Sequence, residues 1–177
     1  MKIHQFTPYS LEGDLGKAYN DYCELVPDDS WILLRDEDTM VLTPKHLHIV
    51  SEYINKFPDT GIFTCYTNRV HHLNKSVLWE GKPSRNFNLL YWYEQSKKAT
   101  ENKYRFKEIK KVISGYYMLF SKATWEKVKF ESGMLGVDNK FSQGVLDLGM
   151  SIKLMKSVLC VHYYRGHKST KNKEHLK

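Results

Sequence analysis

The sequence predicts a single α/β domain with a mixed, mostly parallel sheet flanked by helices. Apolar segments of strand length alternate with amphipathic segments of helix length over the first 67 residues. Hydrophobic residues make up 41% and aromatic residues 14% of the 177 residues, too many for a disordered chain and enough for a buried core. Because the sequence shows no internal repeat and no linker-like stretch, residues 1–177 are expected to form one domain.

Three strands and two helices are expected in the first part of the chain. The first strand alternates only weakly, whereas the next two are continuously apolar, as in strands covered on both faces. Asp14 is a suitable N-cap for the first helix, and Thr43 with Pro44 suits the start of the second. The expected elements are a strand at 2–6, a helix at 14–26, a strand at 30–35, a helix at 43–57 and a strand at 61–67.

The second part of the chain is less regular. Residues 68–111 form a long insert, which in a compact domain is more often a binding loop or lid than scaffold. Residues 166–177 lack apolar periodicity and predict a flexible basic tail. The expected elements are a loop at 71–88, a basic helix at 89–111, a strand at 112–121, a helical turn at 122–128, a helix at 140–149 stopped by Gly149, and a strand at 151–164.

Composition also restricts the class of protein. No apolar run approaches the roughly 18 residues of a membrane span, and the first ten residues lack the apolar core of a signal peptide. Cys23, Cys65 and Cys160 are far apart and odd in number, which predicts reduced core residues rather than a disulfide framework or a metal site. These features predict a soluble, cytoplasmic protein without a membrane span.

The net charge of +7 is unevenly distributed. Residues 1–60 carry eleven acids against five bases, whereas residues 97–111 carry seven bases against two acids. An acidic centre within a basic frame suits a metal ion with a phosphorylated ligand. The alternative is a nucleic-acid-binding module, in which residues 97–111 contact phosphates while Tyr104 and Phe106 stack on bases. The acids of the first 60 residues count against that alternative, since they would repel a polyanion.

Two carboxylates, Asp36 and Asp38, follow directly on the apolar strand at 30–35. Ligands of α/β sheets bind beyond the carboxyl ends of strands, and residues two apart in an extended segment point to the same side. Clustered carboxylates stay ionised when a divalent cation sits among them. A metal site is therefore one interpretation of the pair. The other is a solvated acidic turn that favours the start of the next helix through the helix dipole.

Several motifs in order, over residues 13–165, resemble glycosyltransferases of the GT-A fold, particularly family-2-like nucleotide-sugar transferases. The matching segments are "DLGKAYN", "WILLRDED", "LTPKHL", "ISGYYMLFS", "GVDNKFSQGVLDLG" and "SVLCVHYYR". The chain departs from the family in two places. Its N-terminal strand and helix unit is reduced, with only "FTPYS" in the nucleotide-contacting region, and Val137 precedes Asp138 where many members have glutamate.

The resemblance implies a metal-dependent transferase that moves a sugar from a UDP- or GDP-sugar to a hydroxyl of a glycan, protein or small molecule. It implies that Asp36, Asp38 and His162 bind Mn²⁺ or Mg²⁺, with Asp36 also near the ribose. A histidine ligand favours Mn²⁺ somewhat. Asp138 would be the general base of an inverting transfer. Donor contacts are implied for the following residues: Pro8, Gly16, Lys17, Asn20, Arg165 and, beyond them, Lys168.

Each of these roles has a structural alternative. His162 could be an ordinary histidine at a strand end, and Asp138 could be a helix cap. A catalytically inactive relative that binds nucleotide or glycan is a third candidate function. His71 and His72 are interpreted as acceptor-loop or surface residues. The aromatic residues of the insert could stack on sugars or belong to the core: Trp79, Tyr91, Trp92 and Tyr93.

Overall fold

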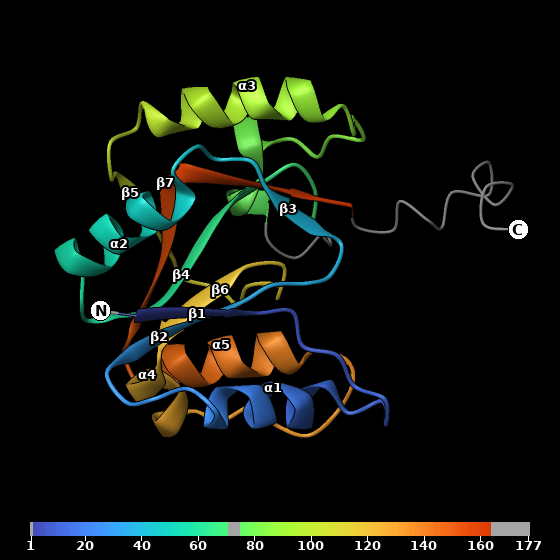
Figure 1. Cartoon of the computed structure of the whole chain (residues 1–177), viewed down its shortest axis with the longest axis vertical. Coiled ribbons are helices and arrows are strands. Elements are labelled where there is room, and N and C mark those ends of the chain that lie inside the picture. Colours follow the sequence, from blue (N-terminus) through green and yellow to red (C-terminus); the bar gives the residue numbers. More distant parts are fainter. Residues whose placement is uncertain (1, 71–74, 164–177) are drawn as a thin grey trace, which may run out of the picture.

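The fold was analysed in a computed structural model, in which residues 2–70 and 75–163 are described (Figure 1). Its centre is a seven-stranded sheet in the order β1-β2-β6-β4-β7-β3, and β5 also pairs with β7. The strands are β1 (Lys2–Phe6), β2 (Ser30–Leu34), β3 (Thr39–Val41), β4 (Thr60–Thr67), β5 (Phe106–Ile109), β6 (Met118–Ser121) and β7 (Ser151–His162).

The sheet is mixed, and the expectation that it is mostly parallel is wrong. Only the pairs β1–β2 and β4–β7 run parallel, whereas β2–β6, β4–β6, β3–β7 and β5–β7 run antiparallel. The antiparallel pairs arise because β6 enters between β2 and β4, and because β3 and β5 are short additions along the long strand β7. The α/β class is confirmed, since helices and strands share one layered unit.

Helices cover both sides of the sheet (Figure 1). Helices α1, α4 and α5 lie along one side, and α3 lies on the opposite side near β7. Tyr53 of α2 contacts Phe63 of β4, which in turn contacts Trp31 of β2. The helices are α1 (Leu15–Glu24), α2 (His46–Lys56), α3 (Leu89–Thr100), α4 (Lys122–Lys127) and α5 (Val137–Asp147), with short 3-10 turns at Lys75–Val77 and Trp79–Gly81.

Most predicted elements form where burial and local capping agree. All residues of β2 are buried, as expected for a continuously apolar strand between two helical layers. Asp14 caps α1 as predicted, because its carboxylate accepts a hydrogen bond from the Lys17 N–H at 2.8 Å. Helix α5 is followed by Gly149 with φ +72°, which ends it as predicted. The three cysteines are buried with free thiols, also as predicted.

The predicted helix at 89–111 is wrong in its second half. Helix α3 ends at Thr100, and after a tight turn the chain continues as β5, antiparallel to β7. Tyr104 packs edge-on against Tyr53 of α2, and Phe106 packs edge-on against Phe57. This aromatic packing and the strand pairing outweigh the helix propensity of the basic residues between them.

Two of the other differences from the predictions have a common cause, namely hydrogen bonding to β7. Thr43 does not cap α2, because its hydroxyl accepts the Leu159 N–H at 2.9 Å and donates to the Leu159 carbonyl. Helix α2 begins instead at His46, after Lys45 in a left-handed conformation. The short strand β3, which the sequence did not predict, pairs with the end of β7.

None of the helices within residues 2–70 and 75–163 has the length and apolar character that a membrane span requires.

Candidate metal centre and adjoining cavities

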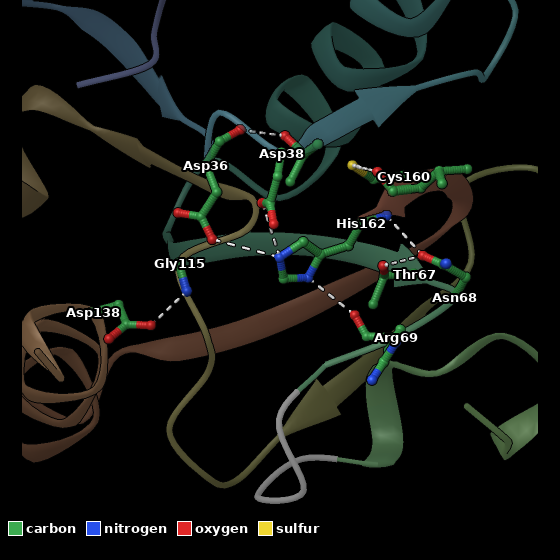
Figure 2. A network of polar contacts seen from close by, with 11 residues as sticks. Asp36, Asp38, Thr67, Asn68, Arg69, Gly115, Asp138, Cys160 and His162 are labelled. Carbon is green, nitrogen blue, oxygen red and sulfur yellow. Dashed lines mark hydrogen bonds and ion pairs between the residues drawn. The ribbon is translucent and has the colours of Figure 1, made fainter. Parts of the chain in front are cut away.

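Asp36, Asp38 and His162 converge at one edge of the sheet (Figure 2). One ligand atom from each residue lies within 4.8 Å of the others. The His162 Nε2 is 3.1 Å from Asp38 Oδ1 and 3.9 Å from Asp36 Oδ2. Two carboxylate oxygens and an imidazole nitrogen are a suitable donor set for a borderline divalent cation such as Mn²⁺.

A local turn and the pairing of β3 with β7 bring Asp38 to His162. The Thr39 hydroxyl donates to the Asp36 carbonyl at 2.7 Å and closes a turn that contains both acids. After this turn, β3 places Thr39 opposite His162, and the Tyr163 N–H donates to the Asp38 carbonyl at 2.8 Å. The acidic turn at the end of β2 is therefore fastened to the end of β7.

The hydrogen bonding of His162 leaves Nε2 directed at the two acids. Its Nδ1 lies 3.0 Å from the Arg69 carbonyl oxygen, which can only accept, so Nδ1 carries a hydrogen. Nε2 then faces the carboxylates either protonated, in an ion pair, or as a lone pair that shares a cation with them. A ligand histidine whose other nitrogen donates to a carbonyl is the usual arrangement at protein metal sites.

Neighbouring residues fix the ring and backbone of His162. The Tyr116 ring stacks on the imidazole at 5.6 Å between ring centroids. The Asn68 side-chain oxygen accepts the His162 N–H at 2.7 Å, and Asn68 itself is fully buried. The His162 residue is only 4% exposed. These contacts hold the imidazole in one orientation and reduce the reorganisation that ligand binding would require.

The electrostatics of the centre are set by burial. Removal from water raises the pKa of Asp36 to about 6; the His162 imidazole opposes the shift, whereas the charges of Asp38, Asp138 and Glu37 add to it. A carboxylate that is this costly to ionise next to other acids is one that a bound cation stabilises strongly.

Asp138 lies in the first turn of α5 and faces the same space as Asp36 (Figure 2). Its carboxylate accepts the Gly115 N–H at 2.6 Å and the Asn139 N–H at 2.9 Å. Burial raises its pKa, and these two backbone hydrogen bonds lower it in part. A side chain at Gly115 would place its Cβ 3.4 Å from Asp36 Oδ1 and 3.4 Å from Asp138 Oδ2, so these oxygens are no more than about 6.8 Å apart.

Two cavities meet at Asp36. One, of about 500 Å³, extends past Asp138 and His162. The other, of about 280 Å³, extends past Pro8, Tyr9 and the turn that contains Asp38. The residues common to both are Leu15, Tyr19, Asp36 and Met134. A ligand could therefore reach from one cavity to the other across the acidic turn.

The residues predicted to contact a donor are placed unevenly. Pro8 lines the smaller cavity. Asn20 and Lys17 line neither: the Asn20 amide bonds the Phe130 backbone and the Trp125 indole, and Lys17 pairs with Asp21 on the surface. Asn20 thus fixes the segment around Phe130 rather than facing either cavity. Two donor candidates, Arg165 and Lys168, lie outside the described residues, as do His71 and His72, which were interpreted as acceptor-loop or surface residues.

Gly16 serves close packing of α1. A Cβ at this position would lie 1.8 Å from the Glu131 carbonyl oxygen, and the Gly16 N–H donates to the Gly133 carbonyl at 3.0 Å. We expect Gly16→Ala to lower the free energy of unfolding by about 1–3 kcal/mol or more, measured by chemical denaturation. The neighbouring Lys17→Ala removes an exposed ion pair and should leave stability nearly unchanged. Normal stability of Gly16→Ala would contradict the packing role.

The aromatic residues of the insert divide between core and surface. Trp92 is buried and its indole donates to the Asn86 carbonyl at 2.5 Å, and Trp79 donates to Gln95. Tyr91 and Tyr93 are about 40% exposed. Tyr104 and Phe106, the stacking residues of the nucleic-acid alternative, pack against α2, so their rings are committed to the domain.

Three groups near Asp36, Asp38 and His162 were not predicted from the sequence. Tyr19 was expected only as an apolar position of a helix, yet it lines both cavities. Asn68 and the Arg69 carbonyl orient His162 from the segment that follows β4. A backbone carbonyl has no sequence signature, whereas a buried polar residue directly after an apolar strand, as at Asn68, could have been considered.

Comparisons with known proteins do not identify a relative. No protein-family model matches this chain, and a search of curated proteins found no match. The geometry and chemistry of the site are therefore the basis for a proposed function.

Proposed function

We propose that the protein is a metal-dependent glycosyltransferase of the GT-A type, which transfers a sugar from a nucleoside-diphosphate donor to a hydroxyl group with inversion. The observation that carries the proposal is the approach of Asp36, Asp38 and His162 at the rim of the sheet, with a further half-buried carboxylate, Asp138, across Gly115. The ordered sequence motifs that resemble this class support the same assignment.

The donor set fits a cation that such a reaction needs. Asp36, Asp38 and His162 would hold Mn²⁺ or Mg²⁺, which when bound neutralises the diphosphate as it leaves. The smaller cavity, lined by Pro8 and Tyr9, would receive the nucleoside part of the donor. The sugar would then lie toward the larger cavity, where Asp138 is exposed to ligand.

Asp138 has the properties of a general base. Burial raises its pKa, which brings the carboxylate closer to the proton affinity that abstraction near neutral pH requires. The hydrogen bonds from Gly115 and Asn139 hold the carboxylate in one orientation. In a single displacement, Asp138 accepts the acceptor's hydroxyl proton, the acceptor oxygen bonds the anomeric carbon, and the bond to the diphosphate breaks. One base without an enzyme nucleophile implies inversion.

A panel of nucleoside diphosphates with and without Mn²⁺ tests the proposal. We expect Mn²⁺ with UDP or GDP, at about one hundred times Kd, to raise the melting temperature by roughly 5–10 °C. Asp38→Ala should abolish the shift. Asp59→Ala is the matched control, since Asp59 is an exposed aspartate in a turn and lines neither cavity.

The contrary result is equally measurable. If no nucleoside diphosphate shifts the melting temperature, and DNA or RNA instead binds tightly with strong salt dependence, the nucleic-acid alternative replaces the transferase. If the nucleotide shift occurs but no sugar is transferred from any donor, the inactive relative is the better description.

A further inference from the structure

The larger cavity has a polar floor and an apolar mouth. Its polar side chains include the buried His162 and Tyr19, which are 4% and 3% exposed, and the half-buried Asp138. At the surface the cavity is bordered by Met134 and Leu135, which are 54% and 88% exposed. The reacting groups are therefore reached past large hydrocarbon side chains.

Few side chains of this cavity could form hydrogen bonds with a hydrophilic acceptor molecule. Apart from the proposed reacting groups, the proposed metal ligand Asp36 and Tyr19, the polar residues among its lining are Ser114 and Asn139. The Asn139 amide already donates to the Ile113 carbonyl at 2.9 Å. A free sugar would bring hydroxyl groups against Leu15, Met134 and Leu135 without side-chain partners, and unpaired polar groups weaken binding.

The apolar mouth is fastened to the domain by Asp14. Its carboxylate accepts the Gly133 N–H at 2.9 Å and a hydrogen bond from the Ser132 hydroxyl, while its own N–H donates to the Ser10 hydroxyl at 2.9 Å. Asp14 thus joins the loop that carries Met134 and Leu135 to the loop before α1. That second loop also exposes apolar side chains, Tyr9 at 67% and Leu11 at 90%.

We propose that the acceptor hydroxyl is attached to an apolar carrier, an alkyl or aryl chain, which lies against Met134 and Leu135. This inference rests on the proposed function for the reacting hydroxyl and on the cavity lining for the carrier. Exposed apolar side chains grouped at the mouth of a cavity suit a hydrocarbon chain better than a hydrated ligand. Met134, Leu135 and Asp138 line the same cavity, so a chain lying against the two apolar residues would place a hydroxyl at its end near Asp138.

The test compares two glucosides that share one head group. Binding of n-octyl β-D-glucoside, below its critical micelle concentration, and of methyl β-D-glucoside is measured by isothermal titration without metal. We expect the octyl compound to bind at least tenfold more tightly. The double variant Met134→Ser with Leu135→Ser should lose about tenfold in octyl affinity and leave methyl binding unchanged. Leu90→Ser, a comparably exposed leucine on α3, should behave as wild type.

Equal affinity for the two glucosides, or the same loss in Leu90→Ser, would overturn the proposal. So would analytical ultracentrifugation showing a dimer that Leu135→Ser dissociates, because the mouth would then be a contact between copies. The nucleotide panel with Asp38→Ala is independent of these titrations. An octyl preference without any nucleotide response would overturn the role of this site in transfer, whereas a nucleotide response without octyl preference would overturn only the apolar carrier.

Discussion

Asp138→Asn is expected to lower the rate of sugar transfer by two to four orders of magnitude, which is the usual contribution of a general base. The amide cannot take up the acceptor proton, but it keeps the size of the carboxylate and can still accept one of the two backbone hydrogen bonds from Gly115 and Asn139. Donor binding should persist, because Asp36, Asp38 and His162 are unchanged. Steady-state kinetics should therefore show loss of kcat, while the melting-temperature shift with Mn²⁺ and nucleotide remains.

Asp147→Asn provides the matched control for this prediction. Asp147 is the last residue of the same helix, is exposed, and accepts a hydrogen bond from Gln143 at 2.8 Å. We expect it to transfer sugar at the wild-type rate. If Asp138→Asn also transfers at that rate, Asp138 is a structural residue of the turn at Gly115 and the base is another group.

Asp36→Asn is expected to stabilise the metal-free protein at pH 7.5 by a few degrees and to abolish the response to Mn²⁺. Burial raises the pKa of Asp36 to about 6, above its ordinary value of 3.8, so the folded state holds this proton more tightly than the unfolded chain. Folding stability from this group is therefore present below about pH 4 and is lost as pH rises through about 6. The neutral amide removes that loss, because it does not ionise.

The same titration predicts how metal binding depends on pH. Above about pH 6 the Asp36 carboxylate is ionised and can bind a cation directly. Below that pH the carboxyl group is protonated, so a cation must displace the proton. We expect the Mn²⁺ affinity to fall by roughly tenfold per pH unit below that value for each proton displaced. Isothermal titration between pH 5 and 8 measures this slope. A flat profile, together with an unchanged Mn²⁺ response in Asp36→Asn, would exclude Asp36 as a ligand.

Three residues of the candidate site could be predicted because they follow or end apolar strands. Asp36 and Asp38 follow β2, and His162 ends β7, so the sequence placed them at the same edge of the sheet, and the pairing of β3 with β7 then brings them together. The resemblance added Asp138, which lies in the first turn of α5. Gly115 lies between this carboxylate and that of Asp36, because its N–H donates to Asp138 and a Cβ there would be 3.4 Å from an oxygen of each.

Other parts could not be predicted, because distant contacts decide them. The helix predicted at 89–111 is interrupted when Phe106 finds Phe57, more than forty residues earlier in the chain. Thr43 resembles a helix cap in sequence, yet its hydroxyl pairs with Leu159 across the fold. Local propensity cannot anticipate such partners, because their free energy comes from packing and pairing that exist only in the assembled sheet.

The last strand has a consequence for biosynthesis. Strand β7 pairs with β3, β4 and β5 and ends in His162. During translation, Asp36 and Asp38 emerge more than a hundred residues before their imidazole partner, so the growing polypeptide has no complete ligand set until nearly all of the sheet can close. If the proposed site holds a cation, its capture would accordingly be among the final events of maturation, and it would not guide the earlier steps of chain collapse.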